Sequence, residues 1–167
     1  MSIPEVGKKI RVTVPSTTAN LGPGFDCLGA ALDLYNEFIF TRIEGDGDRF
    51  DLIMESTDGN HLRGGPENLV FRAAQKVWES ANMTSFALEA RVKLAVPPAR
   101  GLGSSATAIV AGLIGANAIM DSPLSKEKLL ELAIDIEGHP DNVVPSLLGG
   151  LCSVSYTHLR AHETRLN

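Results

Sequence analysis

One strand-to-helix junction limits what this chain can fold into more than any other segment. Over residues 86–96 apolar side chains alternate with charged ones, the period of a half-buried strand. Residues 106–120 are almost wholly apolar, which predicts a helix buried on all sides. A loop rich in glycine and serine joins the two, through Pro97, Pro98, Ala99, Arg100, Gly101, Leu102, Gly103, Ser104, Ser105, Ala106 and Thr107.

This loop has the composition of a phosphate-binding loop. Gly101 and Gly103 allow positive φ and close approach of a ligand, and Ser104 and Ser105 suit the cap of the following helix. The first N–H groups of a helix lack internal partners and carry partial positive charge, so they favour phosphoryl oxygens. A plain glycine turn is the alternative, but residues 101–106 are expected by chance only about once in a million positions.

Composition excludes several other classes of protein. The 167 residues make one ordinary domain, and 44% hydrophobic content with a net charge of −5 predicts an acidic globular protein that binds no nucleic acid. Residues 106–120 are too short for a membrane span. The N-terminus lacks the apolar core of a signal peptide, and the two cysteines form no disulfide framework or zinc site, so we expect a cytoplasmic location. Cys27 is expected to be a small buried side chain.

The hydrophobic pattern predicts an α+β fold. Strands are expected at residues 10–14, at 30–43 as one long or two shorter strands, and at 50–54, together forming an antiparallel sheet. Residues 57–66 read as a polar loop. Helices are expected at 70–81, 106–120 and 129–136, the last ending at Gly138, with a short helix beginning near Val143.

Three segments in order resemble the GHMP kinases. The phosphate loop resembles that family's nucleotide loop, whereas residues 14–26 and 137–145 with Gly149 and Gly150 resemble segments of its homoserine-phosphorylating members. The loop is neither a P-loop, because no Lys follows it, nor a Gly-x-Gly-x-x-Gly dinucleotide motif. The resemblance covers about residues 8 to 153.

The resemblance implies a domain similar to the second domain of ribosomal protein S5. In the family a ferredoxin-like C-terminal domain follows, and we expect it to be missing here. Residues 1–153 are accordingly predicted to be the ATP-binding domain. Residues 154–167 match nothing in the family and are predicted to be a non-native tail resembling adapter read-through, in which His158 and His162 are not expected to bind zinc.

The activity implied for the whole enzyme is ATP- and Mg²⁺-dependent phosphorylation of L-homoserine to O-phospho-L-homoserine, in threonine biosynthesis. The present chain by itself is expected to be inactive. A homodimer is an option for the whole enzyme. Two alternatives stay open: another small alcohol as acceptor, or an incomplete nucleotide-binding domain without catalytic activity.

The resemblance also assigns roles to individual residues. Ser104 and Glu137 match the magnesium-associated pair, although Glu137 alone could be a solvated carboxylate at a helix end. Asn68 matches a residue near adenine or, alternatively, caps its helix. The substrate-binding set is Asn20, Asp26, His139, Asp141 and Asn142, of which Asp26 balances the α-ammonium group. Asp141 and Asn142 complete the catalytic set with Glu137 by orienting substrate, although Asp141 could serve as a base or cap a helix.

Overall fold

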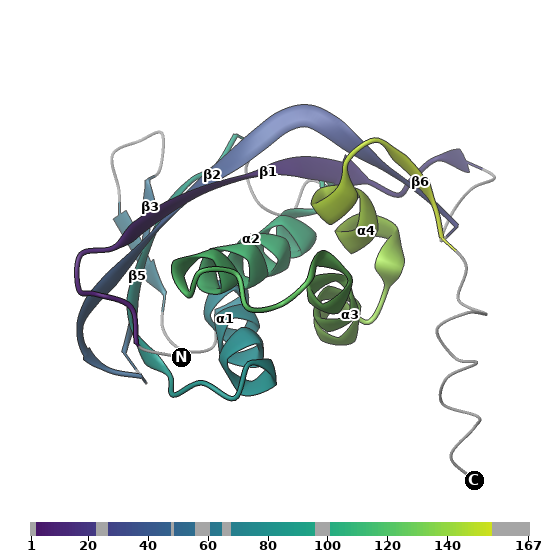
Figure 1. The fold of residues 1–167 in the computed structure, drawn as a ribbon. Helices are drawn as coiled ribbons and strands as arrows, with labels where there is room; N and C mark the ends of the chain where they lie inside the picture. Colours follow the sequence, from purple (N-terminus) through teal and green to yellow (C-terminus); the bar gives the residue numbers. More distant parts are fainter. Residues whose placement is uncertain are drawn as a thin grey trace, which may run out of the picture.

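The computed structural model describes residues 3–22, 27–47, 49–55, 61–64, 68–95 and 101–154. Its strands are β1 (Lys9–Thr18), β2 (Leu28–Asp46), β3 (Phe50–Glu55), β4 (His61–Gly64), β5 (Phe86–Lys93) and β6 (Leu151–Ser153). Its helices are α1 (Leu69–Ser80), α2 (Ser104–Ile119), α3 (Lys126–Glu137) and α4 (Pro140–Leu148). One six-stranded sheet carries these helices on one face, which confirms the α+β prediction (Figure 1).

The strand order corrects the predicted early antiparallel sheet. β1 and β2 do pair antiparallel, and β2 is a single strand of 19 residues. However, β5 lies between β2 and β3, and β3 runs parallel to β5. β4, which falls in the predicted loop at 57–66, pairs with β3. β6 pairs with the first residues of β2, at the end of that strand away from the part that pairs with β5. These pairings are non-local, so alternation along each strand could not reveal them.

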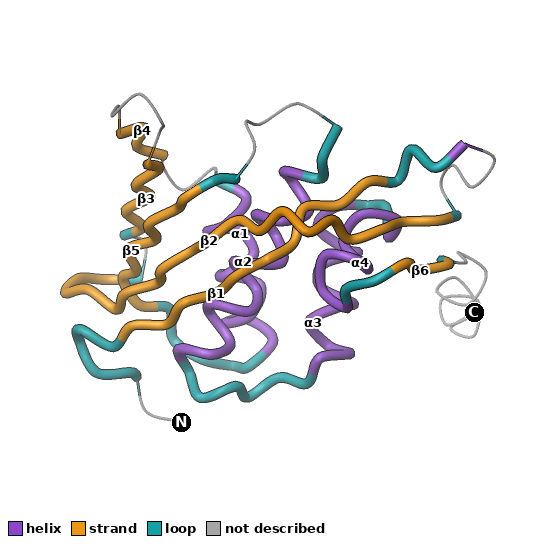
Figure 2. The backbone as a smooth tube through the Cα atoms, turned by 90° about the horizontal axis from the view of Figure 1, so that it is seen from above, coloured by secondary structure: helices purple, strands orange, loops and turns teal. Residues whose placement is uncertain are grey.

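Helix α2 forms the centre of the hydrophobic core, as predicted. It lies beneath the sheet and against α1 (Figures 1 and 2). Two of its glycines make this close packing possible. A Cβ at Gly112 would overlap the Val70 carbonyl oxygen of α1, and one at Gly115 would overlap the ring of Phe40 in β2. The core therefore requires glycine at both positions.

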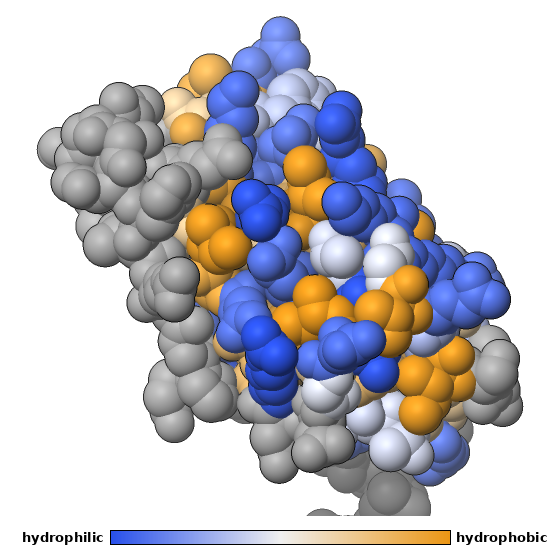
Figure 3. All heavy atoms as spheres, turned by 90° about the vertical axis from the view of Figure 1, so that its left-hand side faces the viewer, coloured by the Kyte–Doolittle hydropathy of each residue, from blue (hydrophilic) through white to orange (hydrophobic). Residues whose placement is uncertain are grey.

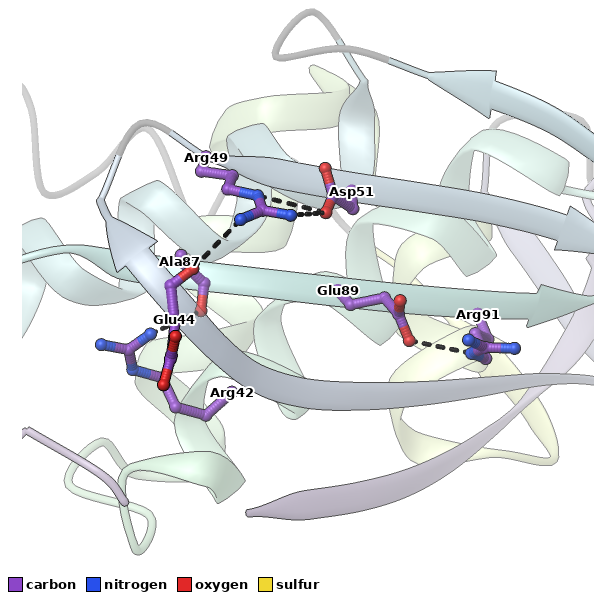
Figure 4. A network of polar contacts seen from close by, with 7 residues as sticks. All are labelled: Arg42, Glu44, Arg49, Asp51, Ala87, Glu89 and Arg91. Atoms are coloured by element: carbon purple, nitrogen blue, oxygen red, sulfur yellow. Dashed lines mark hydrogen bonds and ion pairs between the residues drawn. The ribbon is translucent and has the colours of Figure 1, made fainter. Parts of the chain in front are cut away.

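Three arginines make polar contacts around strands β2, β3 and β5 (Figure 4). Arg42 follows Phe38 and Phe40 on the inward face of β2, where its guanidinium lies 5.3 Å from the centre of the Phe86 ring and donates to the Ala87 carbonyl oxygen. Exposed pairs, Arg49 with Asp51 and Arg91 with Glu89, lie nearby on β3 and β5. The Arg42 side chain thus links β2 to β5.

The surface corrects one prediction about a cysteine. Cys27, expected to be a small buried side chain, is exposed.

On the face shown in Figure 3, hydrophilic residues separate the hydrophobic ones into several groups. Within the described segments, no helix combines the length and hydrophobicity needed to cross a bilayer. Of the predicted tail at 154–167, residues 155–167 lie outside the described residues.

Candidate active site

The phosphate loop ends in two glycines that place the start of α2 at a cavity. Gly101 and Gly103 have φ values of 70° and 63°, a region that favours glycine. Gly103 occupies the N-cap position of α2, so the prediction that Ser104 or Ser105 caps this helix is wrong. No side chain at the cap accepts from the first turn of α2. The positive end of the helix is therefore open to an anionic ligand.

The serine that contacts Glu137 is Ser105. Its Oγ donates a hydrogen bond of 2.6 Å to Oε1 of Glu137, the last residue of α3. Ser104, which the sequence pairs with Glu137, is the first residue of α2 and lines both cavities described below. The structure thus places two hard oxygen donors, Ser105 and Glu137, beside the N-terminus of α2. Mg²⁺ prefers such oxygen ligands.

A polar cavity of about 480 Å³ lies in front of the loop. It brings together the end of β1, the loop and the start of α4, three segments that are far apart in sequence. Asn20, Asp141 and Asn142, to which the resemblance assigns substrate binding, therefore share one cavity with the phosphate loop. The lining residues are Ala19, Asn20, Gly101, Leu102, Gly103, Ser104, Ser105, Asp141 and Asn142.

Helix α4 begins earlier than the sequence predicts. It starts at Pro140, with the exposed His139 at its N-cap position, so Asp141 lies in the first turn and is not the cap residue. A carboxylate in that turn is stabilised by the positive end of the helix. Asp141 is 9% exposed, and its Oδ1 accepts from Nδ2 of Asn142 at 3.5 Å. Helix α4 thus holds both polar side chains at the cavity.

A second cavity, of about 280 Å³, lies on the other side of the same serines. Most of its lining is apolar: Phe38, Leu52, Met54, Leu69, Val70, Val92, Leu94 and Ala108, with the polar residues Asn68, Ser104, Ser105 and Thr107. Asn68 also caps α1, because its Oδ1 accepts from the Val70 amide at 2.8 Å. The alternative that Asn68 caps its helix is therefore confirmed. Asn68 also lines this cavity, and its place near adenine stays a prediction.

Asn36 is a site residue that the sequence prediction missed. This side chain, 1% exposed, accepts from the Ala95 amide beyond β5 at 2.9 Å and donates to Thr107 Oγ1 in α2 at 3.1 Å. Thr107 in turn donates to the Ser104 carbonyl oxygen. Asn36 thereby ties together the two ends of the phosphate loop. An Asn two residues before Phe38, on the inward side of an apolar strand, was the sequence signal for this role.

Several predicted residues fall outside the described residues: Asp26 of the substrate set and Pro97, Pro98, Ala99 and Arg100 of the loop. Among the residues that are described, no group of three or more His, Cys, Asp or Glu side chains could hold a metal ion. A metal at this site would accordingly take few ligands from the described protein and others from a nucleotide or water.

Comparison with known proteins identifies the family. The model of the GHMP kinases N terminal domain matches residues 68–150. The homoserine kinase of Prochlorococcus marinus strain MIT 9301 is 97% identical over 152 residues, which cover 91% of this chain. The chain contains a GHMP kinase N-terminal domain. A homoserine kinase of Parasynechococcus marenigrum is 78% identical over 152 residues.

Solved structures agree with this assignment of the GHMP kinase chain. The homoserine kinase from Cytophaga hutchinsonii superposes with a TM-score of 0.78 at 30% identity, over 93% of this chain and 51% of that one. The mevalonate kinase of Methanococcus jannaschii, at 14% identity and a TM-score of 0.69, shares the fold. The chain covers 48% of the length of its Prochlorococcus relative, so it spans about half of the curated proteins it matches.

Proposed function

We propose that the whole protein to which this GHMP kinase domain belongs transfers the γ-phosphoryl group of ATP to L-homoserine. The observation that carries this proposal is the arrangement of the two cavities, which meet at Ser104 and Ser105. One is lined mostly by apolar side chains and the other by a mixture that includes Asn20, Asp141 and Asn142, and the two serines that line both begin helix α2. A nucleotide in one cavity and an amino alcohol in the other would meet at the phosphate loop.

The nucleotide end of the site follows from the apolar cavity. An adenine ring buries its faces best among apolar side chains, and Asn68 supplies a polar edge there. The phosphates then lie over residues 101–105, where the glycines leave room and the helix supplies partial positive charge. ATP is therefore the phosphoryl donor that fits the shape and charge of this half of the site.

Magnesium fits the oxygen pair of Ser105 and Glu137. These groups already lie 2.6 Å apart, and both are ligand types that Mg²⁺ accepts. When bound, Mg²⁺ would neutralise charge on the transferred phosphate and its leaving group. The role of Ser104 as the metal serine remains a prediction, and a test of both serines is given in the Discussion.

The acceptor end of the site is the polar cavity. Homoserine carries a carboxylate, an ammonium group and a hydroxyl, and the cavity presents Asn20, Asp141 and Asn142 to such groups. The acceptor hydroxyl oxygen bonds to the γ-phosphorus as the bond to the β–γ bridging oxygen breaks, and ADP leaves with that electron pair. The hydroxyl proton passes to an oxygen of the transferred phosphoryl group and from there to water. Asp141 and Asn142 act by orienting the acceptor. Contacts of Asp26 and His139 with substrate remain predictions, since Asp26 lies outside the described residues and His139 is not among those lining the polar cavity.

The choice of homoserine over other alcohols is supported by the relatives. The 97% and 78% identical proteins are both homoserine kinases, whereas the mevalonate kinases match only in fold. A place in threonine biosynthesis, a cytoplasmic location and a homodimer remain predictions. No observation favours the alternative of a domain without activity.

A coupled assay of ADP release tests the proposal. The test protein continues residue 153 of this chain with the remainder of the Prochlorococcus MIT 9301 relative, and we call it the completed protein. ADP release should depend on homoserine, ATP and Mg²⁺ together. Faster turnover of mevalonate or shikimate than of homoserine would refute the substrate assignment.

A further inference from the structure

Thr17, in β1, lies behind the polar cavity and is fully buried. An irregularity in β1 turns this side chain toward the interior of the protein. The pairing of β1 with β2 shifts register between Pro15 and Thr17, and both Ser16 and Thr17 are 0% exposed. In a regular strand, neighbouring side chains point to opposite faces, so the shift is what turns both toward the interior.

Thr17 contacts the other segments of the site. Its hydroxyl lies 2.9 Å from Oδ1 of Asn142 in α4, and its backbone amide donates to the Leu102 carbonyl oxygen at 3.3 Å. It also lies directly against Gly103, where an added Cβ would come within 3.2 Å of the Thr17 Cβ and 3.3 Å of Asn142 Oδ1. Thr17 is not among the residues lining the polar cavity. It therefore supports the site without reaching the substrate.

The directions of the hydrogen bonds made by the Asn142 side chain follow from Asp141, the second residue that the amide contacts. A carboxylate accepts only, so the atom of Asn142 that faces Asp141 Oδ1, at 3.5 Å, is the donating nitrogen Nδ2. The amide oxygen then faces Thr17, and the Thr17 hydroxyl must be the donor in that contact. One N–H of Asn142 remains for a group inside the cavity.

We propose that Thr17 is a positioning residue that fixes which end of the Asn142 amide faces the acceptor alcohol. This inference rests on the proposed function, because it takes Asn142 to orient the acceptor. Without the Thr17 hydroxyl, the amide loses the shorter of the two contacts that orient it, and only the 3.5 Å contact with Asp141 Oδ1 still distinguishes its nitrogen from its oxygen. Asn142 can then turn over and present an acceptor where a donor is needed, which misplaces the attacking hydroxyl.

Kinetics of the completed protein test this role through a double-mutant cycle. Thr17→Val keeps the shape of the side chain and removes the hydroxyl, whereas Thr17→Ser keeps the hydroxyl. We expect Thr17→Val to lower kcat roughly tenfold or more while KM for ATP changes less than about twofold, and Thr17→Ser to stay within about threefold of the parent. Thr13→Val, at an exposed position of the same strand, is the matched control.

The decisive comparison uses Asn142→Ala as background. If Thr17 acts through Asn142, adding Thr17→Val to Asn142→Ala should cause no further loss of kcat. An undiminished loss in that background, or a parallel rise in KM for ATP, would overturn the proposal in favour of a general structural role. If Thr17→Val does not fold, Thr17→Ala removes the same hydroxyl and replaces it in the cycle.

A readout independent of activity separates this inference from the proposed function. In spectra of asparagine-labelled completed protein, Thr17→Val should shift the Asn142 side-chain amide resonances, and Thr17→Ser should leave them nearly in place. Unchanged resonances in Thr17→Val would refute the positioning role. The kinetic cycle is run with whichever alcohol the parent phosphorylates fastest, so failure on homoserine counts only against the substrate assignment.

Discussion

Replacing Gly115 by Ala tests the close packing of α2 because two physical effects predict opposite signs. Gly115 lies inside α2, where Ala is favoured over Gly by about 1 kcal/mol. The added Cβ, however, would overlap Cδ2 and Cε2 of Phe40 and lie 2.8 Å from its Cγ. Phe40 is fully buried beside Phe38, with ring centres 6.4 Å apart, so its ring has little room to move.

The overlap should outweigh the helix propensity. Overpacking of a core costs about 1–3 kcal/mol, and contact with a buried ring belongs at the upper end of that range. Subtracting the propensity gain of about 1 kcal/mol leaves a net loss of about 2 kcal/mol in the free energy of unfolding. Propensity alone would predict a gain of stability instead.

Urea unfolding of the completed protein, followed by the fluorescence of the buried Trp78, measures this difference. Phe40→Leu serves as the rescue partner, since a smaller side chain relieves the overlap. Gly115→Ala should therefore cost less in the Phe40→Leu background than in the parent. If Gly115→Ala unfolds at the same or a higher urea concentration than the parent, the packing argument is refuted.

Three further substitutions in the completed protein test the site. Ser105→Ala should lower turnover at saturating Mg²⁺ roughly tenfold or more, and Ser104→Ala should lower it less, because the oxygen next to Glu137 belongs to Ser105; equal losses in Mg²⁺ titrations would contradict this. Gly103→Ala should abolish measurable ATP binding in calorimetry, because φ is 63° and the new Cβ meets Thr17; binding as tight as in the parent would disprove it. Asn36→Ala should lower the free energy of unfolding in urea by about 2 kcal/mol, from two lost hydrogen bonds of about 1 kcal/mol each, and should also weaken ATP binding. Unchanged affinity for ATP would show that Asn36 does not support the phosphate loop.

The local elements could be predicted from the sequence because their signals are local. Alternation gave β1 and β5, the uninterrupted apolar run gave α2, and Ser125 and Gly138 bracket α3 as its N-cap and C-cap. What could not be predicted depends on partners far away in the chain. The strand pattern of β3 fits β2 and β5 equally well, and only the packed sheet decides that β5 is its neighbour.

The site shows the same division between local and distant information. The sequence identified the loop, Glu137 and the pair Asp141 and Asn142, and the structure brings these segments together. For the serine beside Glu137 it chose Ser104, whereas the structure places Ser105 there. That choice depends on where α2 begins, because each residue along a helix turns the side chain by about 100°. The supporting residues Asn36 and Thr17 depend on contacts across the fold.

Identification of the phosphorylated product tests the central claim most directly. The completed protein is incubated with ATP, Mg²⁺ and equal concentrations of homoserine, mevalonate and galactose in one vessel, and the products are identified by mass spectrometry. The account predicts that phosphate accumulates on homoserine, as O-phosphohomoserine, with little on the other alcohols. Phosphate on mevalonate or galactose in preference to homoserine, or ADP without any phosphorylated alcohol, would contradict it.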